Sequence, residues 1–203
     1  MRLTLAAVFA LGLAACEPAA ESPAAPEAPA RPAEPDAPSA PAVAPLTAEG
    51  WGPLRIGMTR AEVEAALGPD ADPEAVGGPD PESCDQFRPE RAPEGLLVMI
   101  EEGVLTRISV FEPATLTTDR GFGVGASAAD IKAAYGDGLQ AEPHHYLGLP
   151  AEYLTAWSGG QPTEPYVQDA AARGIRYETA ADARVEQILA GLRFQQASYF
   201  NGR

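Results

Sequence analysis

The hydrophobic and polar positions of this 203-residue chain follow different periods in different stretches. Residues 3–13 form a continuous apolar run, and residues 17–46 contain almost no large apolar side chain. Beyond them, apolar positions recur at helical spacing over 60–67 and 128–135, which predicts two short amphipathic helices. Stretches of period two follow each of these segments and predict β-strands.

The two predicted helices belong to an internal repeat. Residues 53–68 (PLRIGMTRAEVEAALG) and 121–136 (GFGVGASAADIKAAYG) align without gaps and share five identical positions. Thr59 and Ser127 are predicted N-caps, each followed three positions later by an acidic residue, as in a capping box. Gly68 and Gly136 stand where the end of a helix takes a positive φ, so the two segments are predicted to fold alike.

The period-two stretches predict an antiparallel sheet. The strands are expected at 84–88, 95–101, 104–111, 143–147, 151–158, 174–179 and 185–192. Glu102-Gly103 predicts a hairpin turn, after which Val104, Thr106, Ile108 and Val110 would share one face of their strand. The predicted fold is α+β, with two tandem units at 47–118 and 119–203. Each unit is a short helical segment packed on an antiparallel β-sheet.

The start of the chain has the layout of an export signal. Arg2 is followed by an apolar run too short to span a bilayer, so residues 1–15 are predicted to be a signal peptide. The ending Leu13-Ala14-Ala15-Cys16 resembles the lipobox of bacterial lipoproteins, which implies that Cys16 is lipidated and becomes the mature N-terminus. The alternative is an ordinary signal peptide, with Cys16 an incidental thiol.

Residues 16–46 are predicted to be a tether. The stretch 17–46 holds nine prolines and eleven alanines, which favours extended polyproline II over a packed structure. At ~3.1 Å per residue, such a segment reaches roughly 90 Å at most. Its predicted role is a spacer between a membrane and the folded domain, and the alternative is a proline-dependent docking site.

The first copy of the repeat resembles two protein families. Ile56-Gly57-Met58-Thr59, Glu62-Val63 and Leu67-Gly68-x-Asp70 resemble the G-M-T-x-x-E-V-x-x-x-L-G pattern of the small outer-membrane assembly lipoproteins (SmpA/OmlA). The β-lactamase-inhibitor proteins are similar and carry two such units in tandem. The whole chain also resembles uncharacterised lipoproteins of Gram-negative bacteria. This resemblance implies an envelope lipoprotein, but the assembly lipoproteins have one unit and the inhibitors have disulfides.

Charge and composition limit the classes of function that the protein can have. The formal net charge of −15 disfavours nucleic acid and anionic lipid head groups, so membrane contact is expected only through lipidated Cys16. No catalytic, cofactor-binding or metal-binding motif stands out. The predicted protein is a non-enzymatic, protein-binding lipoprotein of the cell envelope, with a scaffold, assembly or inhibitor-like role. Its expected place is the periplasmic side, with the outer membrane favoured over the inner. A small-ligand or glycan-binding lipoprotein and an uncharacterised enzyme are the alternatives.

Aromatic residues of the second half are the candidate contacts with a partner. Tyr153 and Trp157 share one face of their predicted strand, and Tyr146 lies on the strand before it. The alternative is that these aromatics belong to the core. Cys84 is the one cysteine after Cys16, so it is expected to be a half-buried thiol or to form a disulfide with a partner protein.

Overall fold

A computed structural model describes residues 44–75, 83–160 and 171–191. The predicted signal peptide, Cys16 and the tether as far as residue 43 lie outside these ranges. The chain divides into two parts, residues 1–40 and 41–203, and all described residues belong to the second. The packed structure begins close to the first described residue, because Leu46 is 1% exposed and its N–H donates to Thr117 O. Leu46, the last residue of the predicted tether, thus belongs to the folded part.

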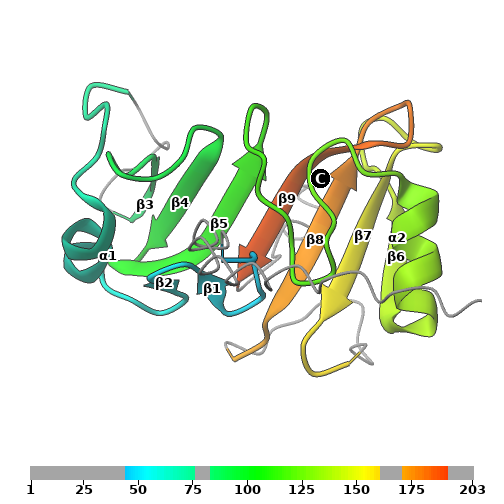
Figure 1. Cartoon of the computed structure of the whole chain (residues 1–203), viewed down its shortest axis with the longest axis horizontal. Helices are drawn as coiled ribbons and strands as arrows, with labels where there is room; N and C mark the ends of the chain where they lie inside the picture. Colours follow the sequence, from blue (N-terminus) through cyan, green and yellow to red (C-terminus); the bar gives the residue numbers. More distant parts are fainter. Residues whose placement is uncertain (1–43, 76–82, 161–170, 192–203) are drawn as a thin grey trace, which may run out of the picture. The chain divides into compact units, whose positions relative to one another are not determined.

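The described part is a mixed, mostly β fold built on a seven-stranded antiparallel sheet with strand order β3-β4-β5-β9-β8-β7-β6 (Figure 1). The elements are β1 (Gly50–Trp51), β2 (Leu54–Arg55), α1 (Arg60–Leu67), β3 (Cys84–Phe87), β4 (Leu96–Glu101), β5 (Val104–Phe111), α2 (Ala128–Tyr135), the 3₁₀ turn η1 (Gly136–Gly138), β6 (Leu139–Pro143), β7 (Glu152–Trp157), β8 (Gly174–Thr179) and β9 (Val185–Gly191). Strands β1 and β2 form a separate two-stranded sheet. The predicted combination of helices with an antiparallel sheet is confirmed, with strands predominating.

Both predicted helices form between their predicted ends. The Thr59 and Glu62 side chains each bond the other's backbone N–H, which is the predicted capping box. In α2, Ser127 Oγ accepts from Ala129 N–H, and the described hydrogen bonds contain no reciprocal bond from Asp130. We attribute this difference to the aspartate side chain, which is one methylene shorter than glutamate. Gly68 and Gly136 have φ of 90° and 53°, so both positive-φ predictions are confirmed.

The core lies between one face of the sheet and the two helices. Val63 of α1 and Ile131 of α2 are fully buried against the alternate apolar residues of the strands, in one continuous cluster. Those strand residues include Leu96, Val98, Ile100, Ile108, Val110, Leu154, Ile175, Tyr177, Ile188 and Ala190. At the centre, Tyr177 hydroxyl bonds Thr118 Oγ1 and Tyr135 hydroxyl, both at 2.9 Å.

Two bulges change which residues face this core. Met99 pairs with Arg107 and Ile100 pairs with Leu105, so Thr106 is an extra residue in β5. Leu105 is therefore buried in the same cluster as Ile108, although strict alternation predicted that it would face the other side. A second bulge lies in β9, where Glu178 pairs with Gln187 and Thr179 with Val185.

The predicted strand at 143–147 is wrong. Strand β6 ends at Pro143, and the chain then turns, because His144 Nδ1 accepts the N–H groups of Tyr146 and Leu147. Gly148 closes the turn with φ of 63° and donates its N–H to His144 O. These local hydrogen bonds compete with strand pairing. The two histidines and Tyr146 thus lie in the loop between β6 and β7.

Candidate binding face of the sheet

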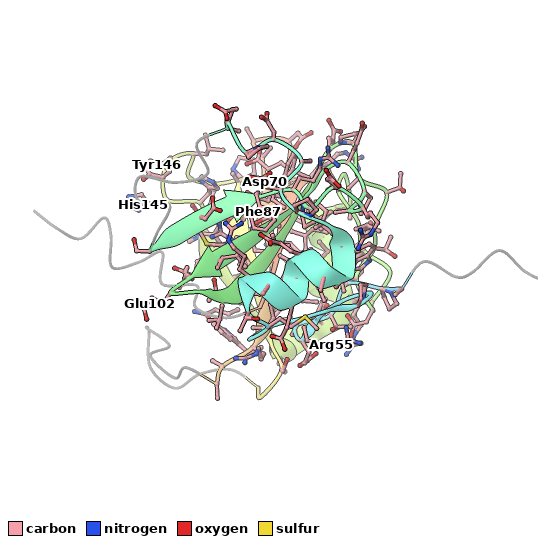
Figure 2. All side chains as sticks on the ribbon, turned by 90° about the vertical axis from the view of Figure 1, so that its left-hand side faces the viewer. Arg55, Asp70, Phe87, Glu102, His145 and Tyr146 are labelled. Carbon is pink, nitrogen blue, oxygen red and sulfur yellow. The ribbon has the colours of Figure 1, made fainter. Side chains whose placement is uncertain are left out.

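The face of the sheet opposite the helices carries a set of polar and aromatic side chains, which we call the polar face. It is defined by the residues that alternate with the core positions: Gln86, Arg107, Ser109, Tyr153, Thr155, Trp157, Arg176, Glu178, Gln187 and Leu189. One row of it runs straight across four strands, from Ser109 through Leu189 and Arg176 to Thr155. In Figure 2, His145 and Tyr146 lie on the opposite side of the domain from Arg55.

Arg176 of β8 is buried in the second half of this face. Its Nε donates to Thr155 Oγ1 at 3.2 Å, and its guanidinium lies 5.2 Å from the centre of the Tyr153 ring. Loss of hydration lowers the pKa of Arg176, and the nearby Glu178 and Glu142 carboxylates oppose this shift. Arg176 is therefore held by both polar and aromatic neighbours.

Arg107 of β5 is half-buried on the same face and has fewer partners. Its Nη2 donates to Gln86 Oε1 at 3.3 Å, whereas its Nε is buried without a hydrogen-bond partner. Burial lowers the pKa of Arg107, and Glu101 and Glu178 act in the opposite direction. The two arginines thus flank the centre of the face on either side of β9.

Two more buried polar atoms on this face have no hydrogen-bond partner, Ser109 Oγ and Glu178 Oε1. Together with Arg107 Nε they are three of the four such side-chain atoms found among the described residues. Burial raises the pKa of Glu178, and the charges of Arg176, His144 and Arg107 oppose the shift. Buried polar groups are normally paired, so this concentration marks the face as a candidate contact site.

The loop after β6 extends this face with an apolar tip. Its Tyr146, Leu147 and Leu149 side chains are 65%, 53% and 68% exposed and are the exposed large hydrophobic residues of the described ranges. The ring of His144 lies 4.6 Å from that of Tyr153, which joins the loop to β7. The apolar tip therefore lies beside Tyr153, at one end of the polar face.

The three predicted contact residues take different positions on this surface. Tyr146 is exposed in the loop, whereas Tyr153 and Trp157 are half-buried at the two ends of β7 on the polar face. Trp157 Nε1 donates to Gln140 Oε1 at 3.1 Å. His144 thus connects Tyr146 to Tyr153. Trp157 lies about 13 Å from Tyr153, further along the same strand. Cys84 is a half-buried thiol at the start of edge strand β3.

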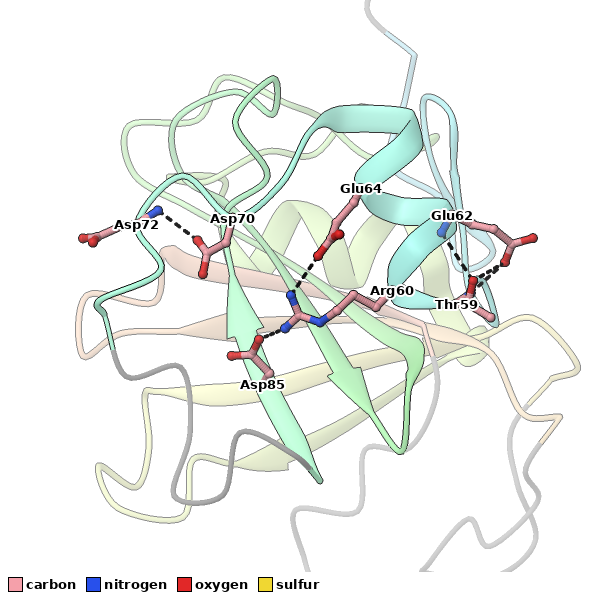
Figure 3. A network of polar contacts seen from close by, with 7 residues as sticks. All are labelled: Thr59, Arg60, Glu62, Glu64, Asp70, Asp72 and Asp85. Carbon is pink, nitrogen blue, oxygen red and sulfur yellow. Dashed lines mark hydrogen bonds and ion pairs between the residues drawn. The ribbon is translucent and has the colours of Figure 1, made fainter.

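A second polar network lies in the first half, around α1 (Figure 3). Arg60 forms ion pairs with Glu64 and with Asp85 of β3, and its guanidinium lies 4.4 Å from the centre of the Phe87 ring. These contacts join Arg60 of α1 to Asp85 and Phe87 of β3, so the network helps to fix α1 to the sheet. No group of side chains suited to a metal ion occurs in the described part.

Sequence reasoning missed Arg107, Ser109, Arg176 and Glu178 as site residues. Their signal in the sequence is weak, because β5 and β8 each mix polar with apolar residues and no motif sets these four apart. Only the pairing of β5 with β9 and of β9 with β8 brings them onto one face. Among the described helices, none is long and apolar enough to cross a membrane.

Comparisons with protein-family models, with curated proteins and with solved structures found no match to this chain.

Proposed function

We propose that this domain is a non-catalytic module that binds another protein of the cell envelope. The observation that carries the proposal is the apolar tip at Tyr146, Leu147 and Leu149, which lies at one end of a sheet face with unpaired buried polar atoms. Exposed apolar side chains next to aromatic and arginine residues are typical of protein interfaces. Assembly, scaffold and inhibitor-like roles all fit such a surface.

We also propose that 47–118 and 119–203 are two copies of one unit, as in the families that the sequence resembles. In the first, Gly57 N–H donates to Leu105 O and Leu105 N–H donates to Met58 O. In the second, Gly125, Val185 and Ala126 make the same two bonds. The bulges at Thr106 and Glu186 each come directly after these residues of β5 and β9.

The copies differ on the polar face, which supports a binding role there. Arg107 on β5 corresponds to Gln187 on β9, and Ser109 corresponds to Leu189, when the two bulges are aligned. Residues needed only to build the repeated sheet would be expected at both places. The unmatched polar residues are better explained by a contact made on one side of the repeat.

Binding of a small ligand or glycan is the second candidate. It is favoured by the half-buried rings of Tyr153 and Trp157 beside polar groups, including Thr155 between them on the same face. We propose no enzymatic role. In the described part, His144 Nδ1 is occupied by two backbone N–H groups, which leaves that nitrogen unsuited to act as a base.

The apolar tip provides the test of protein binding. We expect Tyr146→Ser combined with Leu149→Ser to leave the melting temperature unchanged, because both side chains are largely exposed. Crosslinking in intact envelopes should then recover the partner at least about tenfold less efficiently, since apolar anchors dominate interface energies. Arg55→Gln, on the opposite side of the domain, is the control. Full recovery with the double variant would contradict the proposal.

Salt should also weaken the complex. The net charge of −15 favours a partner with a basic surface around its contact site, and such an attraction is screened at higher ionic strength. Association rates measured from 50 to 500 mM salt should fall, with a smaller change in dissociation rates. A rate that is independent of salt would exclude this electrostatic contribution.

We propose that the module is anchored through lipidated Cys16, on the periplasmic side and at the outer rather than the inner membrane. Mass spectrometry of the mature protein should show an acylated N-terminal cysteine, and Cys16→Ala should block processing or release the protein. An unmodified chain that starts elsewhere would contradict the anchor. Membrane fractionation would separate the outer from the inner location.

A further inference from the structure

The loop between β6 and β7 is closed at its base by its own backbone. His144 N–H donates to Ala151 O at 2.8 Å, Ala151 N–H donates to Gly148 O at 3.0 Å, and Gly148 N–H donates to His144 O at 2.8 Å. None of these three hydrogen bonds involves a side chain. The base of the loop is therefore expected to keep its shape when a side chain of the loop changes its charge.

The apolar tip depends in addition on one imidazole ring. Nδ1 of His144 accepts the backbone N–H groups of Tyr146 and Leu147, at 3.2 and 3.3 Å. A ring nitrogen that accepts hydrogen bonds carries no proton, so this arrangement requires the neutral ring with its hydrogen on Nε2. The positions of two of the three residues of the apolar tip are thus coupled to the protonation state of His144.

A proton on Nδ1 is incompatible with both hydrogen bonds. The imidazolium ion donates from both of its nitrogens and accepts at neither, so the two backbone N–H groups would face a further N–H and a positive charge. Imidazole is the side chain that ordinarily changes its charge between pH 5 and 8. His144 is half-buried in a surface loop, so it can take up a proton from solvent without unfolding of the domain.

The neighbouring strand β8 offers a different partner to the charged ring. Glu178 Oε1 is buried and has no hydrogen-bond partner in the described structure. Burial raises the pKa of Glu178, and the positive charges of Arg176 and His144 oppose this shift. A positive charge on His144 is therefore attracted by the Glu178 carboxylate.

The other titratable and charged groups around His144 belong to β6, β7, β8 and the loop itself. They are Glu142, Tyr153, Arg176, His145 and Tyr146. The Tyr153 ring lies 4.6 Å from the His144 ring, and Arg176, 5.2 Å from the centre of the Tyr153 ring, disfavours a second positive charge. Glu142, two residues before His144, favours one. His145 is the only other histidine of the chain, which makes it the control residue.

We propose that protonation of His144 regulates the apolar tip. The neutral imidazole holds Tyr146 and Leu147 in the binding arrangement, and the imidazolium ion releases them and turns towards Glu178. The binding arrangement therefore predominates above the pH at which His144 takes up a proton and is lost below it. This inference rests on the proposed protein-binding function, because it concerns the same apolar tip, and adds its regulation.

The direct test follows the backbone amide signals of Tyr146 and Leu147 by NMR, in the ¹⁵N-labelled full chain, from pH 5 to pH 8. Both signals should move together with the ring signals of His144 and share one midpoint, because one proton breaks both hydrogen bonds. His144→Asn supplies a side-chain oxygen that accepts from the same backbone and does not titrate, so it should abolish the movement. His145→Asn is the matched control and should titrate as the wild type does.

Three results would overturn the inference. They are wild-type amide signals that do not move between pH 5 and pH 8, signals that still move in His144→Asn, and signals that no longer move in His145→Asn. Glu178→Gln removes the carboxylate that attracts the imidazolium ion, so the shared midpoint should move to lower pH. A midpoint that stays in place or rises would show that Glu178 is not the partner of the charged ring.

Partner capture separates this inference from the proposed function. Recovery of the partner by the wild type should fall at least about fivefold from pH 7.5 to pH 5.5, in proportion to the lost binding arrangement, and His144→Asn should resist this fall. If both proteins respond equally to pH while Tyr146→Ser with Leu149→Ser binds poorly throughout, the protein-binding function stands and the regulation is wrong. If that tip variant recovers the partner as well as the wild type does at pH 7.5, the proposed function itself fails.

Discussion

Replacing Gly191 by alanine is expected to lower the free energy of unfolding by about 3 kcal/mol or more. Gly191 ends β9 with φ of 118°, a conformation that residues with a Cβ rarely adopt. A Cβ there would stand 2.5 Å from Thr106 O and 2.6 Å from Ile56 Cδ1. Backbone strain and overpacking therefore both destabilise the folded state. Urea unfolding of the purified protein measures the loss in free energy of unfolding.

Gly103→Ala is the matched control for this result. Gly103 also has a positive φ, 79°, but a Cβ there would have no atom within 4 Å. Its expected loss is about 1 kcal/mol, from backbone strain alone. Adding Ile56→Ala to Gly191→Ala should restore only part of the stability, because the contact with Thr106 O remains. Equal losses for Gly191→Ala and Gly103→Ala would show that close packing at the end of β9 is unimportant.

Arg176→Gln should cost about 3 kcal/mol at pH 8 and clearly less at pH 5. Burial raises the pKa of Glu178, and Arg176 is the largest of the charges that oppose this shift. Without Arg176 the pKa of Glu178 rises further, so the ionised carboxylate, which is favoured at higher pH, is poorly compensated. At pH 5 the folded protein can instead bind a proton there.

The sign of this pH dependence follows from linkage. A carboxyl group whose pKa is raised by folding stabilises the folded state fully below its ordinary pKa and loses this contribution as the pH rises through the folded value. Glu178→Gln cannot titrate, so it should be more stable than the wild type at pH 8 and should flatten the response of Arg176→Gln. Urea unfolding at pH 5 and pH 8 should be measured for the wild type, Arg176→Gln, Glu178→Gln and the variant with both substitutions. A loss for Arg176→Gln that is the same at both pH values would contradict the mechanism.

The helices were predictable because their ends are encoded locally. Thr59 and Glu62 satisfy each other's backbone within four residues, and Gly68 supplies a conformation that needs no distant partner. The β4–β5 hairpin was predictable for the same reason, since Glu102 and Gly103 turn the chain by themselves with positive φ. Local chemistry thus determined the elements whose predicted and observed limits agree.

The predictions that failed concern features that depend on distant residues or on competing local hydrogen bonds. The bulge at Thr106 moves Leu105 into the core, but it is visible only once β4 and β5 are in register. The predicted strand around His144 was lost to hydrogen bonds from its own loop. Arg107 and Ser109 became a candidate site only after β9 had paired with β5. Sequence patterns on single strands do not contain that pairing.

The junction of β5 and β9 also has a consequence during synthesis and folding. Ile108 pairs with Ala190, so the inner edge of β5 stays open until nearly the whole domain has been made. Until then β5, with the sequence VLTRISVF rich in β-branched residues, presents the kind of unpaired edge that recruits other chains. A nascent chain of this protein therefore depends on rapid completion, or on a chaperone that shields β5, to avoid pairing with its neighbours.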